Sequence, residues 1–195
     1  SQVTTRKLRK LSSIAALGAL SVLTGCGAAL VEAPYYNVSE VQSFKVAGAP
    51  SQIMMLDVVD ANDTLDNQTW ADALSNHGYP PRLNFVIDAA DIADTQTIKP
   101  ENRLVVVVNP TQTTMRGTLC TDPQSAKSDG TSDRVIVRFG FCAGDDIISE
   151  TRARLVRNKF EQQVINSADT ISFQLFPRHI RDEDDDNCSR RVPGC

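Results

Sequence analysis

The stretch RLVVVVN, residues 103–109, decides the fold of this chain of 195 residues. Its four consecutive valines are β-branched, and such side chains favour the extended backbone of a strand. No polar residue alternates with them, which is typical of a strand buried on both faces. The sequence therefore predicts a sheet with a layer of structure on each side.

Other runs of strand length lie on both sides of this one. Residues 53–59 are compact and apolar, and residues 134–141 alternate apolar side chains with others, as in a half-buried strand. Shorter strands are predicted at 83–87, 114–120 and 171–176. A polar loop, residues 121–133, separates two of them.

Two helices complete the predicted domain. The first covers residues 67–76, and the second begins at Asp145 and Asp146, whose side chains suit an N-cap, and runs to about Asn166. Its apolar residues return to one side of the helix: Ile148, Leu155, Val156, Phe160 and Val164. We expect one small domain over residues 53–177, of class α+β or α/β, with a mixed sheet of about five or six strands and two helices.

The chain starts with a segment typical of an export signal. Arg6, Lys7, Arg9 and Lys10 occur without an acidic residue, and residues 11–23 are mostly small or apolar. This run of 13 residues is shorter than the roughly 20 that a helix needs to span a bilayer. It is therefore a poor permanent membrane anchor.

The segment ends in Leu23-Thr24-Gly25-Cys26, which resembles the lipobox of bacterial lipoprotein precursors. The resemblance implies that residues 1–25 are a signal peptide and that Cys26 becomes the first mature residue, carrying fatty acyl chains such as palmitate that hold it stably in the membrane. Gly27 stands where an Asp would favour the inner membrane, so we expect the outer membrane, with the protein facing the periplasm. The alternative is a buried amphipathic N-terminal helix with an incidental cysteine.

Two segments flank the predicted domain. Residues 26–52 contain scattered Pro and Gly without periodicity, so they are predicted to be a lipidated tether. Residues 178–195 form an acidic tail that contains cysteine, and its five consecutive acidic residues, Asp182 to Asp186, are typical of a solvated terminus. A calcium site is the alternative, but the ligand spacing of an EF-hand is missing.

Charge restricts the partners. Residues 1–25 hold four basic and no acidic residues, so the remainder has 16 basic against 24 acidic residues and a net charge of −8. Such a surface repels nucleic acid and anionic lipid headgroups.

Four cysteines follow Cys26, an even number that suggests two disulfides in an exported chain. A disulfide that closes a short loop is favoured, which pairs Cys188 with Cys195 and, by elimination, Cys120 with Cys142. If 114–120 and 134–141 were direct hairpin partners, however, Cys120 and Cys142 would lie on the order of 25 Å apart, beyond disulfide reach. Either those strands are not partners or the pairing differs. No two cysteines have the close spacing of a zinc site, so no metal is expected.

The sequence contains no recognisable catalytic arrangement and implies no cofactor. Its two histidines, His77 and His179, lie in loop-like sequence, and Gly-x-Ser-x-Gly and Gly-rich phosphate motifs are missing. We therefore expect a non-catalytic protein.

One local motif suggests a ligand. Residues 148–156, ISETRARLV, resemble the helical L-S-x-x-R-A-x-x-V stretch of OmpA-like peptidoglycan-binding domains. The resemblance implies that Arg152 helps to hold the carboxylate of a peptidoglycan stem peptide. The partner aspartate of that family has no direct counterpart here, which leaves Asp145 as the candidate substitute.

Two functions follow from these observations. The leading hypothesis is a lipid-anchored outer-membrane protein that acts as an interaction or assembly factor by docking on an envelope protein. The alternative is a peptidoglycan-binding lipoprotein that tethers the outer membrane to the cell wall through Arg152.

Overall fold

The computed structural model describes residues 27–180. The predicted signal peptide, the acidic run of the tail, and Cys26, Cys188 and Cys195 lie outside the described residues. Within 27–180 no helix is both long and apolar enough to cross a bilayer.

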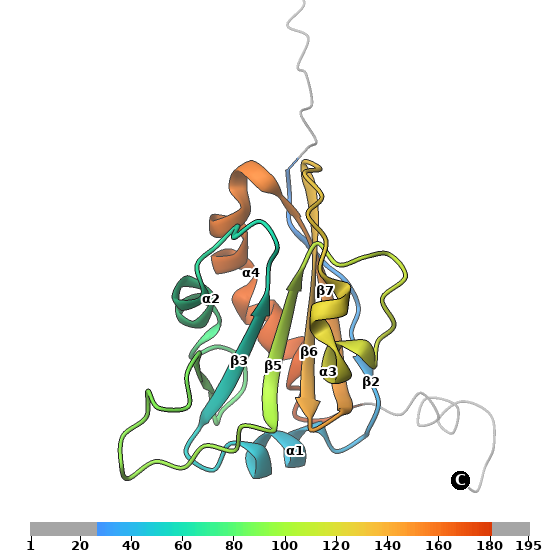
Figure 1. The fold of residues 1–195 in the computed structure, drawn as a ribbon. Helices are drawn as coiled ribbons and strands as arrows, with labels where there is room; N and C mark the ends of the chain where they lie inside the picture. The colour runs from blue at the N-terminus through green and yellow to red at the C-terminus, as the bar shows by residue number, and fades with distance from the viewer. Residues whose placement is uncertain (1–26, 181–195) are drawn as a thin grey trace, which may run out of the picture.

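The described chain is an α+β domain built on one mixed sheet, as predicted (Figure 1). The strands follow the spatial order β1-β7-β6-β5-β3-β4, and β2 also pairs with β7. Their bounds are β1 (Leu30–Val31), β2 (Tyr35–Tyr36), β3 (Ile53–Val59), β4 (Asn84–Val86), β5 (Asn102–Val108), β6 (Arg134–Ala143) and β7 (Asp146–Val156). Strands β4, β3 and β5 run parallel, and all other pairings are antiparallel.

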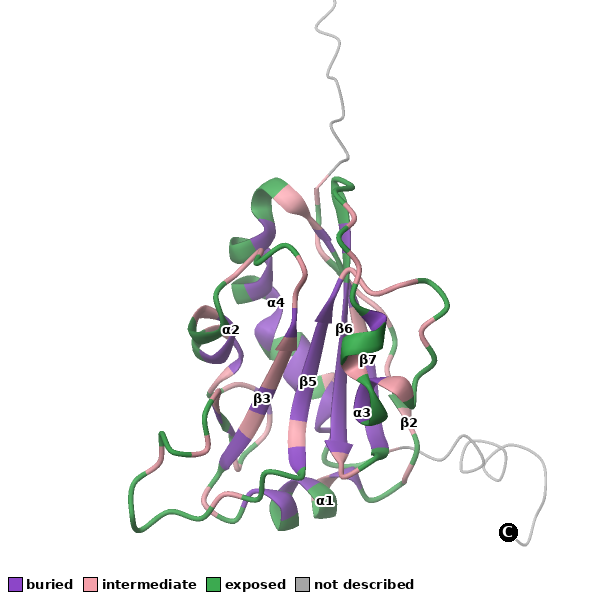
Figure 2. Ribbon diagram, in the orientation of Figure 1, coloured by how far each residue is buried: buried purple, intermediate pink, exposed green. Residues whose placement is uncertain are grey.

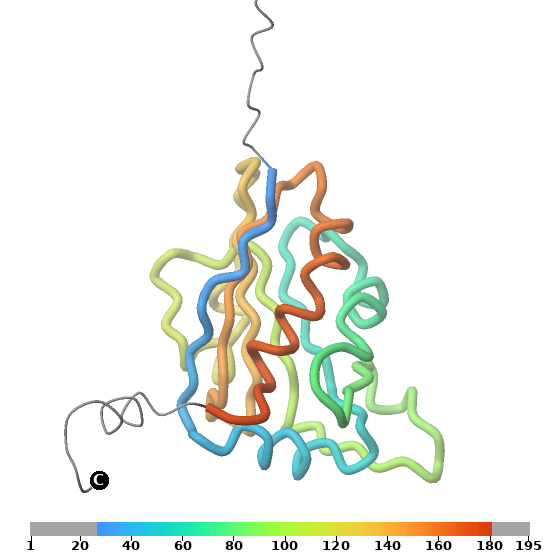
Figure 3. The backbone as a smooth tube through the Cα atoms, turned by 180° about the vertical axis from the view of Figure 1, so that it is seen from behind, coloured from blue at the N-terminus to red at the C-terminus, as the bar shows by residue number. Residues whose placement is uncertain are grey.

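Helices α2 (Asn67–Leu74) and α4 (Phe160–Leu175) cover one side of the sheet, which we call the helix face (Figures 1 and 3). The short helix α1 (Val41–Gly48) closes one end. The centre of the helix face is Trp70 of α2, which is fully buried and meets the rings of Phe139 and Phe160 edge-on at 6.1 and 5.7 Å between centroids. This aromatic cluster belongs to the larger of two apolar cores.

The other side of the sheet, the disulfide face, is covered over part of its area by α3 (Thr118–Thr121) and the 3-10 turn Pro123–Ala126. Here lies the smaller core, which includes Val105 and Val107, whereas Leu104, Val106 and Val108 point into the larger one. The prediction that the valine run is buried on both faces is confirmed. Figure 2 shows β5 and β6 buried along most of their length, with exposed residues on α3.

A disulfide joins α3 to the sheet. Cys120 and Cys142 are bonded, with their Cα atoms 5.6 Å apart. The predicted pairing of these two cysteines is confirmed, and the conflict with a hairpin disappears because residues 118–121 form a helix above the sheet. The predicted strand at 114–120 is wrong, since β6 pairs with β5 and β7 instead.

The predicted helix at 145–166 is also wrong over its first half. Residues 146–156 form β7, joined to β6 by a tight hairpin in which Gly144 adopts a positive φ of 60°. The true period is two: Ser149, Thr151, Ala153 and Leu155 alternate with charged residues. The helix begins only at Phe160 and continues through 171–175, where a last strand was predicted.

The predicted tether at 26–52 is corrected as well. Leu30 and Val31 pair with β7, Tyr35 and Tyr36 extend the same edge, and α1 follows. This segment lacks sequence periodicity because its strands are only two residues long and take their partner from a distant part of the chain. Residues 30–48 therefore belong to the folded domain.

Candidate functional site

The charged residues of β7 lie on the disulfide face. In the β6–β7 register Glu150 stands opposite Gly140, Arg152 opposite Arg138, and Arg154 opposite Ile136. Successive side chains of a strand alternate between faces, so these three share the side opposite the helices. The β6–β7 register shifts between Phe141 and Cys142, so the alternation does not continue unchanged into the hairpin end of the two strands.

Glu150 is the centre of a cluster of ion pairs. Its side chain is only 2% exposed, and its Oε1 accepts from Arg138 Nε at 2.8 Å and from Arg152 Nε at 3.1 Å. Its Oε2 accepts from Arg116 Nε at 2.8 Å. Three guanidinium groups therefore share one carboxylate, and the cluster carries a net charge of about +2 because arginine stays protonated.

Two of the arginines, Arg138 and Arg116, have further contacts that hold their side chains. Arg138 is buried, and its Nη1 donates to the Thr114 carbonyl at 2.6 Å. Arg116 comes from the loop between β5 and α3, and its guanidinium carbon stacks 3.7 Å from the ring centroid of Tyr35 on β2. In the described part of the chain, Arg138 Nη2 is buried without a hydrogen-bond partner.

Burial and the neighbouring arginines shift the pKa of Glu150 in opposite directions. Burial raises the pKa of this carboxyl, while hydrogen bonds and positive charge from Arg138 and Arg152 lower it more, so that the pKa lies below its ordinary value. Glu150 is therefore ionised at neutral pH, and the buried Arg138 has a charged partner.

A hollow of about 280 Å³ opens beside this cluster. It is lined by Glu32, Ala33, Tyr35, Arg116, Glu150, Thr151 and Arg152. The side chains of Arg116 and Arg152 are 42% and 40% exposed, so each keeps donors available to a ligand. Arginine forks bind carboxylates and phosphates in a bidentate manner, which makes this hollow suited to a small anionic group.

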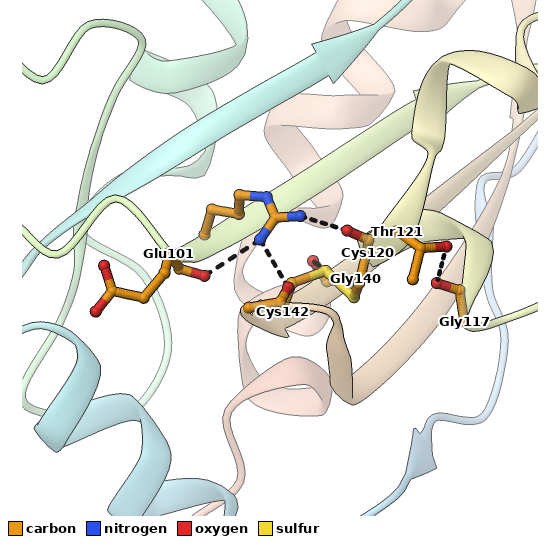
Figure 4. The surroundings of a disulfide bond; sticks show 8 residues. Glu101, Gly117, Cys120, Thr121, Gly140 and Cys142 are labelled. Carbon is orange, nitrogen blue, oxygen red and sulfur yellow. Dashed lines mark hydrogen bonds between the residues drawn. A yellow bond between two sulfur atoms is a disulfide. The ribbon is translucent and has the colours of Figure 1, made fainter.

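The disulfide lies on the same face (Figure 4) and fixes α3, the helix that follows the loop carrying Arg116. Arg116 is four residues before Cys120, whose carbonyl accepts from Arg103 Nη2 at 2.6 Å. Arg103 Nη1 in turn donates to the Gly144 carbonyl at 2.9 Å. The bond and this arginine together tie α3 to the β6–β7 hairpin.

The structure separates the two ligand-binding residues predicted from sequence. Arg152 lines the hollow, but it lies on a strand, so the helix of the OmpA-like resemblance is not present at 148–156. Asp145 is exposed in the β6–β7 hairpin, seven residues and about 20 Å along the strand from Arg152. It is not the partner of Arg152, whose carboxylate partner is Glu150.

Sequence reasoning missed Glu150, Arg116, Arg138 and Tyr35. The alternating pattern Glu150, Arg152, Arg154 was the one available signal, and it indicates a strand with a charged face. Arg116 and Tyr35 reach the site through loops and an edge strand, which no local pattern predicts.

The described residues contain no group of three His, Cys, Asp or Glu side chains placed to hold a metal ion. No family model, curated protein or solved structure matches this chain.

Proposed function

We propose that this protein is a lipid-anchored component of the bacterial outer membrane that acts without catalysis, by docking on an envelope protein through the hollow beside Glu150. The anchor is Cys26, on the strength of the lipobox resemblance, and the domain faces the periplasm. The observation that carries the docking role is the pair of partly exposed arginines, Arg116 and Arg152, which share a single carboxylate with a buried third arginine.

Charge supports a partner with an exposed carboxylate. The chain beyond residue 25 carries a net charge of −8, whereas the three arginines around Glu150 give the cluster beside the hollow a net charge of about +2. Glu32, which also lines the hollow, is paired with Arg154. The arginines therefore attract an acidic segment of a partner that a net negative surface otherwise repels, and this attraction orients the docking.

The test is chemical crosslinking of the full chain in its native membrane. Arg152→Gln is expected to reduce the crosslinked adduct about tenfold, because it removes a charged donor from the hollow. Arg134→Gln is the matched control: it removes the same charge from the neighbouring strand β6, is exposed, and does not line the hollow. Equal losses in the two variants would eliminate the hollow as the docking site.

Peptidoglycan is a second candidate partner, because the side chain of Arg152 remains available to a stem-peptide carboxylate. Under this function the full chain co-sediments with purified sacculi, and Arg152→Gln, but not Arg134→Gln, weakens the binding. Failure of the unmodified chain to co-sediment would exclude it.

The anchor is tested separately. Cys26→Ala is expected to leave an uncleaved or soluble product. Normal processing and outer-membrane fractionation of that variant would contradict the lipid anchor.

A further inference from the structure

The chain is held against the domain from its first described residue. The Gly27 carbonyl accepts a hydrogen bond from Gln163 Nε2 on α4, and Leu30 already pairs with Arg154 on β7. Gly27 has a φ of +142°, which side-chain-bearing residues rarely adopt, and a Cβ at this position would lie 3.0 Å from Lys159 Nζ. No free tether separates Gly27 from the folded domain.

Gly27 lies at one end of the sheet, which we call the anchor end: Gly27, the turn Arg157–Lys159 between β7 and α4, and loop 127–133. Arg157 joins the last two, because its Nε donates to the Ser132 carbonyl at 2.9 Å and its Nη2 to the Gly130 carbonyl at 3.1 Å. The hairpin between β6 and β7 lies at the opposite end (Figures 1 and 3). Strand β7 has 11 residues, so the two ends are about 35 Å apart.

The distance from Cys26 to this end is fixed by covalent geometry. Consecutive Cα atoms are about 3.8 Å apart. The polar headgroup layer on each side of a bilayer is about 5–8 Å thick. A cysteine whose acyl chains enter the hydrocarbon region therefore brings Gly27, with Lys159 and Gln163 beside it, to the level of the headgroups.

We propose that the anchor end contacts the bilayer, with the Lys159 ammonium among the phospholipid phosphates and the β6–β7 hairpin directed into the periplasm. This inference rests on the proposed lipidation of Cys26. The anchor end and the residues next to it include the bases Lys127, Arg134, Arg157 and Lys159 and the acids Asp129, Asp133 and Glu161, so the charges are mixed. The acyl chains supply the attachment, and the short connection from Cys26 sets the orientation.

A matched pair of exposed turn residues tests the orientation. A photoreactive amino acid is placed at Asn158, in the turn that follows β7, or at Asp145, in the hairpin that precedes it. The full chain is purified and reconstituted into vesicles of phosphatidylethanolamine and phosphatidylglycerol. We expect at least tenfold more lipid adduct from position 158 than from position 145, and equal labelling or more labelling at 145 would overturn the proposal.

Two further measurements separate the effect of the short connection from the effect of the lipid anchor. Inserting twelve Gly/Ser residues after Cys26 allows about 20 Å of separation and should reduce the bias towards 158 severalfold, and an undiminished bias would contradict the short connection as its cause. If the unmodified chain does not float with the vesicles, both the lipid anchor and the orientation that depends on it are wrong. If the chain floats but shows no bias, only the orientation is wrong.

Discussion

The two faces of the sheet are made by the same strands but have opposite chemistry. On β6, Val137, Phe139 and Phe141 point to the helix face and are fully buried in the large core. Arg138 and Cys142 point to the disulfide face, where the short helix α3, a disulfide and a cluster of ion pairs cover only part of the sheet. The helix face supplies most of the stability, and the disulfide face offers charged donors that a partner can reach.

The largest expected effect of a single substitution lies on the helix face. Phe139→Ala removes a buried ring in contact with Trp70 and should lower the free energy of unfolding by about 4 kcal/mol. Ile136→Ala, three residues earlier on the disulfide face and 40% exposed, should change it by less than about 1 kcal/mol. Urea denaturation compares the two, and similar losses would remove the distinction between the faces.

The next effect tests the buried charge of the disulfide face. Glu150→Gln leaves Arg138 buried without a charged partner, so we expect a loss of about 3 kcal/mol in denaturant unfolding at pH 7. Adding Arg138→Met should restore part of this loss, because the uncompensated charge is then gone. A double variant less stable than Glu150→Gln alone would contradict the pairing as its cause.

The same carboxylate predicts acid sensitivity. The pKa of Glu150 is lowered by Arg138 and Arg152 against the effect of burial, so its contribution is complete above the ordinary glutamate value and is lost as pH falls through the folded-state pKa. The unmodified protein should lose stability more steeply below about pH 4.5 than Glu150→Gln. Parallel curves would show that Glu150 does not titrate differently in the folded state.

The disulfide should contribute about as much as the Glu150 pair. Its cysteines are 22 residues apart, and closing a loop of that length stabilises a fold by about 3 kcal/mol. Cys120→Ser with Cys142→Ser should lower stability by that amount and increase hydrogen exchange in α3 more than in α4. Uniform changes across both helices would show that the bond does not act locally on the disulfide face.

The sequence predicted the helix-face architecture better than the site. The valine run of β5 and the alternation in β6 identify their strands because burial there follows a regular period. Strand β7 was mistaken for a helix because Leu155, Val156, Phe160 and Val164 have helical spacing, although the first two belong to a strand. The role of Glu150 was not predicted because its burial depends on ion pairs with Arg116 and Arg138. These arginines come from other parts of the chain, so no local sequence pattern indicates the contact.

The smallest expected effect is a change of stability with pH that comes from Lys45, a buried lysine on α1. Burial and, next, the charge of Arg178 lower the pKa of Lys45 to about 8, while its Nζ donates to the Tyr79 carbonyl at 2.8 Å. An unfolded lysine keeps its proton to about pH 10.4, so stability should rise by about 1.5 kcal/mol between pH 8 and 9.5. Lys45→Met should lack this rise.

The pH range for this measurement ends below pH 10 because Tyr36 affects stability at higher pH. Burial, followed by Tyr79, raises the pKa of Tyr36 to about 12, so stability is expected to fall again above pH 10. An unchanged rise in Lys45→Met would assign the effect to another group.

Site-specific photocrosslinking in the native membrane tests the central claim, that the disulfide face is the docking face, most directly. A photoreactive amino acid is placed in the full chain at Ala33, in the hollow, or at Thr170, exposed on α4. We predict a discrete adduct with an envelope protein from position 33, lost in the Arg152→Gln background, and none from position 170. An adduct from position 170 alone, or one from position 33 that Arg152→Gln leaves unchanged, would contradict the account.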